Sequence, residues 1–155
     1  MQLGFELNGS PMRLECEPER RLLSMLREDL ALVGAKPGCE IGRCGACMVW
    51  LDGEPVNSCL VMAWQVQGRR VTTIEAIAAD PGSATVRDAL SRAGAVQCGY
   101  CNPGIVVAMT FLHRRMPRPD VLEATALMSG NLCRCTGYGG VSRAITELFG
   151  LDLPH

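Results

Sequence analysis

Cysteines supply most of the chemistry that this sequence offers, and there are nine of them in 155 residues. Four lie in the first half with the spacing C-x4-C-x2-C-x11-C, at positions Cys39, Cys44, Cys47 and Cys59. Plant-type [2Fe–2S] sites use this spacing: three thiolates on one short loop wrap around the cluster, and a fourth follows later in the chain. The first half is therefore predicted to hold a [2Fe–2S] cluster.

A second set of four cysteines lies in the other half, as a C-x2-C pair and a later C-x-C pair, at Cys98, Cys101, Cys133 and Cys135. Both pairs fall in predicted loops between helices, and two such loops at one end of a bundle could supply four ligands to one metal centre. Asn102-Pro103 is typical of a helix start, with Asn102 as the capping side chain. The positive end of that helix would favour the thiolate form of Cys101.

Zinc is the alternative metal, because structural zinc sites also use four cysteines and often contain C-x2-C pairs. The first set lacks the two C-x2-C pairs of a zinc ribbon, and a C-x-C pair is awkward for a zinc knuckle, so iron–sulfur is favoured. Disulfides are not expected, because the cytosol keeps thiols reduced. Cys16 lies outside both sets in a predicted strand, and we expect it to have a structural role.

The elements that position these cysteines change in character along the chain. Strands are predicted over 2–8, 12–17, 48–51 and 70–73, with turns at Asn8-Gly9 and Asp52-Gly53 and a helix over the leucines between 22 and 30. Helices are predicted over 74–79, 85–93, 104–116, 119–128 and 141–149. The break at Asp80-Pro81-Gly82-Ser83 predicts an α+β chain with two domains, residues 1–79 and 80–155.

Composition excludes several classes of protein. Hydrophobic residues make up 48% and charged residues 20% of the chain, which is typical of a folded globular protein. The formal net charge of −1 offers no basic surface for nucleic acid. No apolar run approaches the roughly 20 residues of a membrane span, and no signal peptide is recognisable, so a cytoplasmic location is expected.

The cysteine motifs together resemble the small iron–sulfur subunit of the molybdenum hydroxylases, a family that includes xanthine dehydrogenase and aldehyde oxidoreductase. The resemblance covers essentially the whole chain, and it rests on four blocks in the family's order and spacing: Gly38–Cys47, Asn57–Cys59, Gln97–Gly104 and Gly130–Tyr138. It implies a β-grasp, plant-type ferredoxin-like domain holding the first cluster, followed by a helical bundle holding the second.

The resemblance also implies partners and a direction of electron flow. The second cluster would lie nearest a molybdenum–pterin cofactor in a large partner subunit, where Gln97 and Cys135 match positions that approach the pterin. That partner would oxidise the substrate, and electrons would leave one at a time through both clusters to a medium FAD subunit or another acceptor. A hetero-oligomer such as a dimer of heterotrimers would follow, in which this chain performs no substrate chemistry itself.

One alternative from another functional class is a free-standing ferredoxin with two clusters that carries electrons between enzymes by diffusion. Soluble carriers tend to use a surface of one charge sign to steer their encounters, whereas this chain is nearly neutral and somewhat apolar. A hydrolase has no support, because no nucleophile motif such as G-x-S-x-G is present. The electron-transfer subunit is therefore the favoured interpretation.

Overall fold

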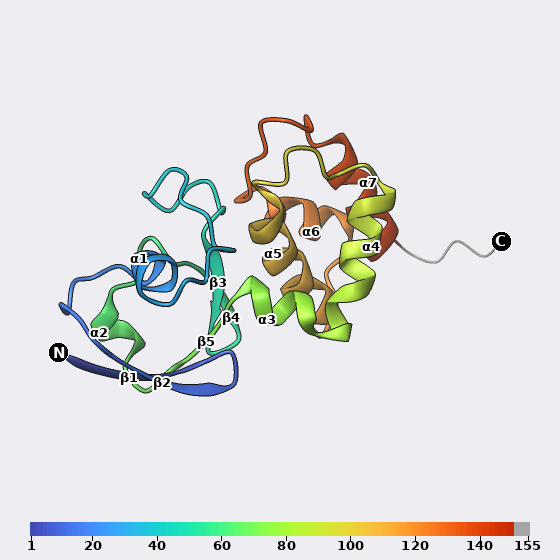
Figure 1. Cartoon of the computed structure of the whole chain (residues 1–155). Coiled ribbons are helices and arrows are strands. Elements are labelled where there is room, and N and C mark those ends of the chain that lie inside the picture. Colours follow the sequence, from blue (N-terminus) through green and yellow to red (C-terminus); the bar gives the residue numbers. More distant parts are fainter. Residues whose placement is uncertain (151–155) are drawn as a thin grey trace.

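Strands occupy the first half of the chain and helices the second, in a computed structural model that describes residues 1–150 (Figure 1). The strands form one five-stranded sheet in the order β2-β1-β5-β3-β4, in which β1 and β5 are parallel and the other neighbours are antiparallel. Their bounds are β1 Gln2–Leu7, β2 Ser10–Glu15, β3 Met48–Leu51, β4 Glu54–Asn57 and β5 Arg70–Thr72. The predicted α+β class is confirmed.

Both hairpins of the sheet turn where the sequence predicts. Asn8 and Gly9 join β1 to β2 with φ values of 51° and 83°, and Asp52 and Gly53 join β3 to β4 with φ values of 53° and 87°. Two consecutive residues with positive φ are typical of type I′ turns, whose twist matches that of the flanking strands. These turns set the register that places the buried side chains of each hairpin on one face.

A short helical segment covers the sheet. It consists of α1 (Leu22–Ser24) and a π-helical continuation, η1 (Met25–Asp29), and it buries Leu22, Leu26 and Met25 against the strands. The helix predicted from the leucine spacing is therefore present, although it ends one residue before Leu30. A further short helix, α2 (Ala63–Val66), contacts β1 and completes the first hydrophobic core.

The second half is a bundle around one central helix, and each helix lies within two residues of its predicted range. The central helix α5 buries most of its length, including Ile105, Val107 and Met109. Among residues 1–150, no helix is both long and apolar enough to cross a membrane. The bounds are α3 Ile74–Ala79, η2 Pro81–Ser83 (a 3-10 turn), α4 Ala84–Arg92, α5 Asn102–Arg114, α6 Val121–Met128 and α7 Gly139–Phe149.

The two halves pack directly against each other through β3 and α5. Trp50 of β3 belongs to the hydrophobic core of the bundle, and its indole Nε1–H donates a hydrogen bond to the Val107 carbonyl of α5 at 3.2 Å. The guanidinium of Arg114 lies 5.4 Å from the centre of the Trp50 ring. Ile77 of α3 also packs in the bundle core, before the predicted boundary at 79/80, which stays a prediction.

Removing the indole hydrogen bond should weaken this junction measurably. We expect Trp50→Phe, which keeps an aromatic ring but removes the indole N–H that donates to the Val107 carbonyl, to cost about 0.5–1.5 kcal/mol. For a chain of this length each kcal/mol lowers the melting temperature by about 2–4 °C, so we expect a fall of about 1–6 °C in circular dichroism at a fixed heating rate. Trp64→Phe is the matched control, because Trp64 is 58% exposed. An equal loss in both variants would contradict this role of Trp50.

Candidate metal centres

The loop that carries the first three cysteines curls around their thiols. Positive φ values at Glu40, Gly42 and Gly45 bend the backbone repeatedly, so that its N–H groups turn inward. Cys39 Sγ accepts hydrogen bonds from the backbone N–H groups of Ile41 (3.5 Å), Arg43 (3.1 Å) and Cys44 (3.3 Å). This arrangement stabilises negative charge on sulfur, as an iron-bound thiolate requires.

The first four cysteines form an outer and an inner pair. In the outer pair, the Cys39 N–H lies 3.4 Å from Cys44 Sγ, and hydrogen bonds from the Ile41 and Arg43 N–H groups lower the pKa of Cys39 to about 6. The inner pair, Cys47 and Cys59, is 3% and 1% exposed. Burial, with the Cys59 thiol alongside, raises the pKa of Cys47 to about 11.

The second four cysteines meet at one end of the helical bundle, where the loop before α5 lies beside the loop between α6 and α7 (Figure 1). All four line a hollow of about 250 Å³. They too form pairs: Cys98 and Cys135 are exposed and contact each other, whereas Cys101 and Cys133 lie deeper and contact each other. Cys44 of the first set lines the same hollow.

The start of α5 differs from the sequence prediction. The N-cap residue is Cys101, no side chain caps the helix, and Asn102 instead accepts a hydrogen bond from the Cys101 thiol at 3.6 Å. Burial, followed by the neighbouring Cys133 thiol, raises the pKa of Cys101 to about 12. The predicted effect of the helix start on the Cys101 thiolate stays a prediction, because burial and the Cys133 thiol act in the opposite direction on this pKa.

The deeper thiol of the second loop has the opposite shift. Burial by itself raises the pKa of Cys133, but hydrogen bonds from the side chain and backbone of Thr136 outweigh it and bring that pKa to about 7. Thr136 is not among the site residues that the cysteine motifs predict. Its signal was available, because a hydroxyl residue three positions after a cysteine in a tight turn can reach back to the sulfur.

The two sets of cysteines adjoin each other across the domain junction. The Leu132 N–H, next to Cys133, donates a hydrogen bond to the Cys44 carbonyl at 2.9 Å. The backbones also approach closely at Gly104 and Gly45, where a Cβ built on Gly104 would lie 2.1 Å from the Gly45 carbonyl oxygen. A backbone contact therefore joins a loop of each set.

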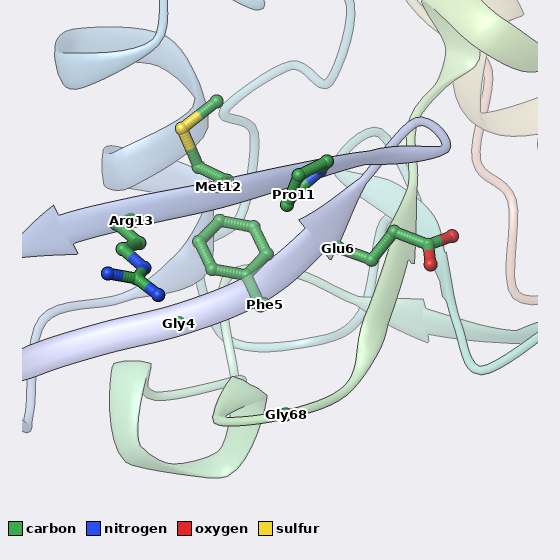
Figure 2. Close-up of a pocket in the computed structure, with 7 residues that line it drawn as sticks. All are labelled: Gly4, Phe5, Glu6, Pro11, Met12, Arg13 and Gly68. Atoms are coloured by element: carbon green, nitrogen blue, oxygen red, sulfur yellow. The ribbon is translucent and has the colours of Figure 1, made fainter.

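Other features of the chain lie away from these cysteines. Cys16 is partly buried and packs against the first core, in agreement with its predicted structural role. Across residues 1–150, no three Cys, His, Asp or Glu side chains are arranged to hold a single metal ion. The hollow of about 690 Å³ in Figure 2 lies over β1 and β2, and its lining contains no cysteine: Gly4, Phe5, Glu6, Pro11, Met12, Arg13 and Gly68.

Comparison with known proteins matches both halves to iron–sulfur domains. Residues 5–73 match the 2Fe-2S iron-sulfur cluster binding domain, and residues 73–146 match the [2Fe-2S] binding domain. The nicotinate dehydrogenase small FeS subunit of Eubacterium barkeri is 42% identical over 92% of this chain and 91% of its own length. The xanthine dehydrogenase iron-sulfur-binding subunit of Escherichia coli O157:H7 is 41% identical over 91% of this chain and 89% of its own. The chain belongs to the small iron–sulfur subunits of the molybdenum hydroxylases.

Solved structures agree with this membership. One chain of quinoline 2-oxidoreductase from Pseudomonas putida 86 is 39% identical, with a TM-score of 0.84. The match spans 95% of the iron–sulfur subunit and 91% of that chain. Aldehyde oxidoreductase from Desulfovibrio gigas has a TM-score of 0.85 and 33% identity, where the match spans 96% of the subunit and 17% of the longer chain. The iron–sulfur subunit therefore carries two [2Fe–2S] clusters and transfers electrons within a molybdenum enzyme complex, and iron rather than zinc is its metal.

Proposed function

We propose that this iron–sulfur subunit passes electrons one at a time from the molybdenum–pterin cofactor of a large partner subunit to a medium FAD subunit or another acceptor. The observation that carries the proposal is the contact between the two sets of cysteines, where the Leu132 N–H donates to the Cys44 carbonyl at 2.9 Å. Each bound cluster supplies a one-electron redox centre. The residues of this chain hold, separate and orient the two centres.

All eight cysteines of the two sets would be ligands. The first cluster would be held by Cys39, Cys44, Cys47 and Cys59, and the second by Cys98, Cys101, Cys133 and Cys135. A binuclear cluster needs two thiolates for each iron, and the observed pairing of the thiols within each set supports this assignment. The inner pair of each set would then hold the more buried iron and the outer pair the more exposed one.

The exposed side of the second set suits entry of electrons from the large subunit. Cys98 and Cys135 are exposed at the surface, and so is Gln97, and this exposure supports the predicted place of Gln97 and Cys135 beside the pterin of the partner. Leu132 is bonded to Cys133, and its N–H donates a hydrogen bond to the Cys44 carbonyl. A short route through bonded atoms thus connects the second set of ligands to the first.

The rim of the first cysteine loop suits exit to the acceptor. Ile41 and Leu60 are 62% and 52% exposed and flank this loop, and the Leu60 side chain lies next to Gly42. Exposed apolar side chains around a redox site are typical of a surface that a partner protein covers. A medium FAD subunit on this face, within a cytoplasmic dimer of heterotrimers, would complete the proposed assembly.

Anaerobic purification of the native complex tests this function. Iron, acid-labile sulfide, zinc and molybdenum are measured per copy of this chain, together with the paramagnetic resonance spectrum after reduction with dithionite. We expect about four irons, about four sulfides and two distinct [2Fe–2S] signals, with molybdenum and a larger chain in the same fraction. Two clusters in a lone monomer would favour the free ferredoxin, and zinc in place of iron would overturn the proposal.

A further inference from the structure

A hydroxyl group faces a ligand sulfur of the second site from within the same turn. Thr136 Oγ1 lies 3.2 Å from Cys133 Sγ, and the Tyr138 N–H donates a hydrogen bond to that same oxygen at 3.2 Å. Because the Tyr138 N–H occupies an acceptor position of the oxygen, the one hydroxyl proton of Thr136 is free to point at sulfur. An iron-bound Cys133 has lost its own proton, so its sulfur can only accept.

The turn holds this contact in place. The Tyr138 hydroxyl accepts a hydrogen bond from the Cys133 backbone N–H at 3.2 Å, and Tyr138 itself has a φ of 66° at the start of α7. The residues between them are therefore tied at both ends. Cys133 is 7% exposed, so water competes little for its sulfur.

We propose that the Thr136 hydroxyl raises the reduction potential of the second cluster by donating a hydrogen bond to Cys133 Sγ. The inference rests on the proposed function, in which Cys133 binds iron. Adding an electron increases the negative charge shared by the cluster sulfurs, so a donor at sulfur stabilises the reduced state more than the oxidised state. Thr136 is thus not a metal ligand itself, and it acts by donating a hydrogen bond to the ligand Cys133.

The two sites differ in how this charge is stabilised. The hydrogen bonds to Cys39 Sγ in the first loop come from backbone N–H groups, which every substitution except proline leaves in place. At Cys133 Sγ a side-chain hydroxyl donates in addition to the backbone N–H groups of Thr136 and Cys135, so a single substitution can change the potential of the second site. A higher potential there makes the second cluster a better acceptor of electrons arriving from the partner subunit.

A redox titration of the purified complex, followed by paramagnetic resonance, tests the inference in three variants. In Thr136→Val the hydroxyl is lost at similar volume, and the midpoint potential of the second cluster should shift to a more negative value while the first cluster keeps its potential. Thr136→Ser keeps the hydroxyl and should stay close to the unaltered protein. Thr125→Val is the remote control, because the Thr125 hydroxyl donates to the Val121 carbonyl of α6, away from any sulfur.

The second signal is identified independently as the one that Cys98→Ser alters. An unchanged potential in Thr136→Val, or an equal shift in Thr136→Ser, would overturn the inference while leaving two clusters and the proposed function intact. Absence of the second signal from the unaltered complex would overturn both. If the valine variant binds less iron, Thr136→Ala is titrated in its place, because alanine cannot overfill the turn.

The proposed hydrogen bond can also be observed directly in the unaltered protein, by the magnetic coupling of its proton to the reduced second cluster. The hydroxyl proton should appear as a strongly coupled proton of the reduced second cluster that exchanges rapidly in D2O, unlike buried backbone N–H protons. It should disappear in Thr136→Val and persist in Thr136→Ser. The lack of such a proton in the unaltered complex would rule out the proposed hydrogen bond.

Discussion

Cys59→Ala should lose the first cluster and keep the second, so that iron falls to about two atoms per chain, half of the number expected from two [2Fe–2S] clusters. Cys59 is 1% exposed and lies beside Cys47, so no water or other thiol can easily take its place. Iron and sulfide analysis, with the paramagnetic resonance spectrum, would measure the loss. One of the two signals should vanish and the other remain.

Two further variants separate ligand loss from misfolding. Cys59→Ser preserves the volume of the side chain and should lose the same signal, because a hydroxyl is a poorer ligand for iron than a thiolate. Cys16→Ala removes a cysteine that lies outside both sets, and it should keep all of the iron. A full complement of iron in Cys59→Ala would contradict the ligand assignment of the first site.

Gly104→Ala should push the start of α5 away from the loop that carries the first three cysteines. The added Cβ would lie 2.1 Å from the Gly45 carbonyl oxygen and 3.3 Å from Ala46 Cα, and these backbone atoms cannot rotate away. Overfilling a packed site of this kind costs about 1–3 kcal/mol. Since unfolding of a cluster protein is irreversible, the loss is best measured as faster bleaching of the visible absorbance on heating.

A matched glycine provides the control for this variant. A Cβ on Gly130 meets no atom within 4 Å, so Gly130→Ala should bleach at nearly the rate of the unaltered protein. Gly104→Ala should bleach about tenfold faster, since each 1.4 kcal/mol corresponds to about a factor of ten. The magnetic interaction between the two reduced clusters should also weaken, because their separation increases. Equal bleaching rates in both variants would contradict the prediction, because they would show that the chain accommodates a Cβ at Gly104 without loss of stability.

Much of the fold was predictable because its signals are local. Turns such as Asn8-Gly9 and Asp52-Gly53 specify positive φ through the residue types themselves, and the structure has those values. Helical periodicity predicted each helix of the bundle to within two residues, since burial of one face depends on spacing along the chain. The cap of α5 was mispredicted, because the Asn102 side chain accepts a hydrogen bond from the Cys101 thiol and does not cap the helix.

The sequence by itself determined which cysteines form each set and which helices and strands carry them, because ligand spacing and periodicity are properties of consecutive residues. Only the tertiary structure decided how the thiols pair, which pair of the second set reaches the surface, and that Leu132 meets Cys44 across the domain junction. These contacts join residues far apart in the chain. Packing of β3 against α5 brings them together, and no local pattern encodes that geometry.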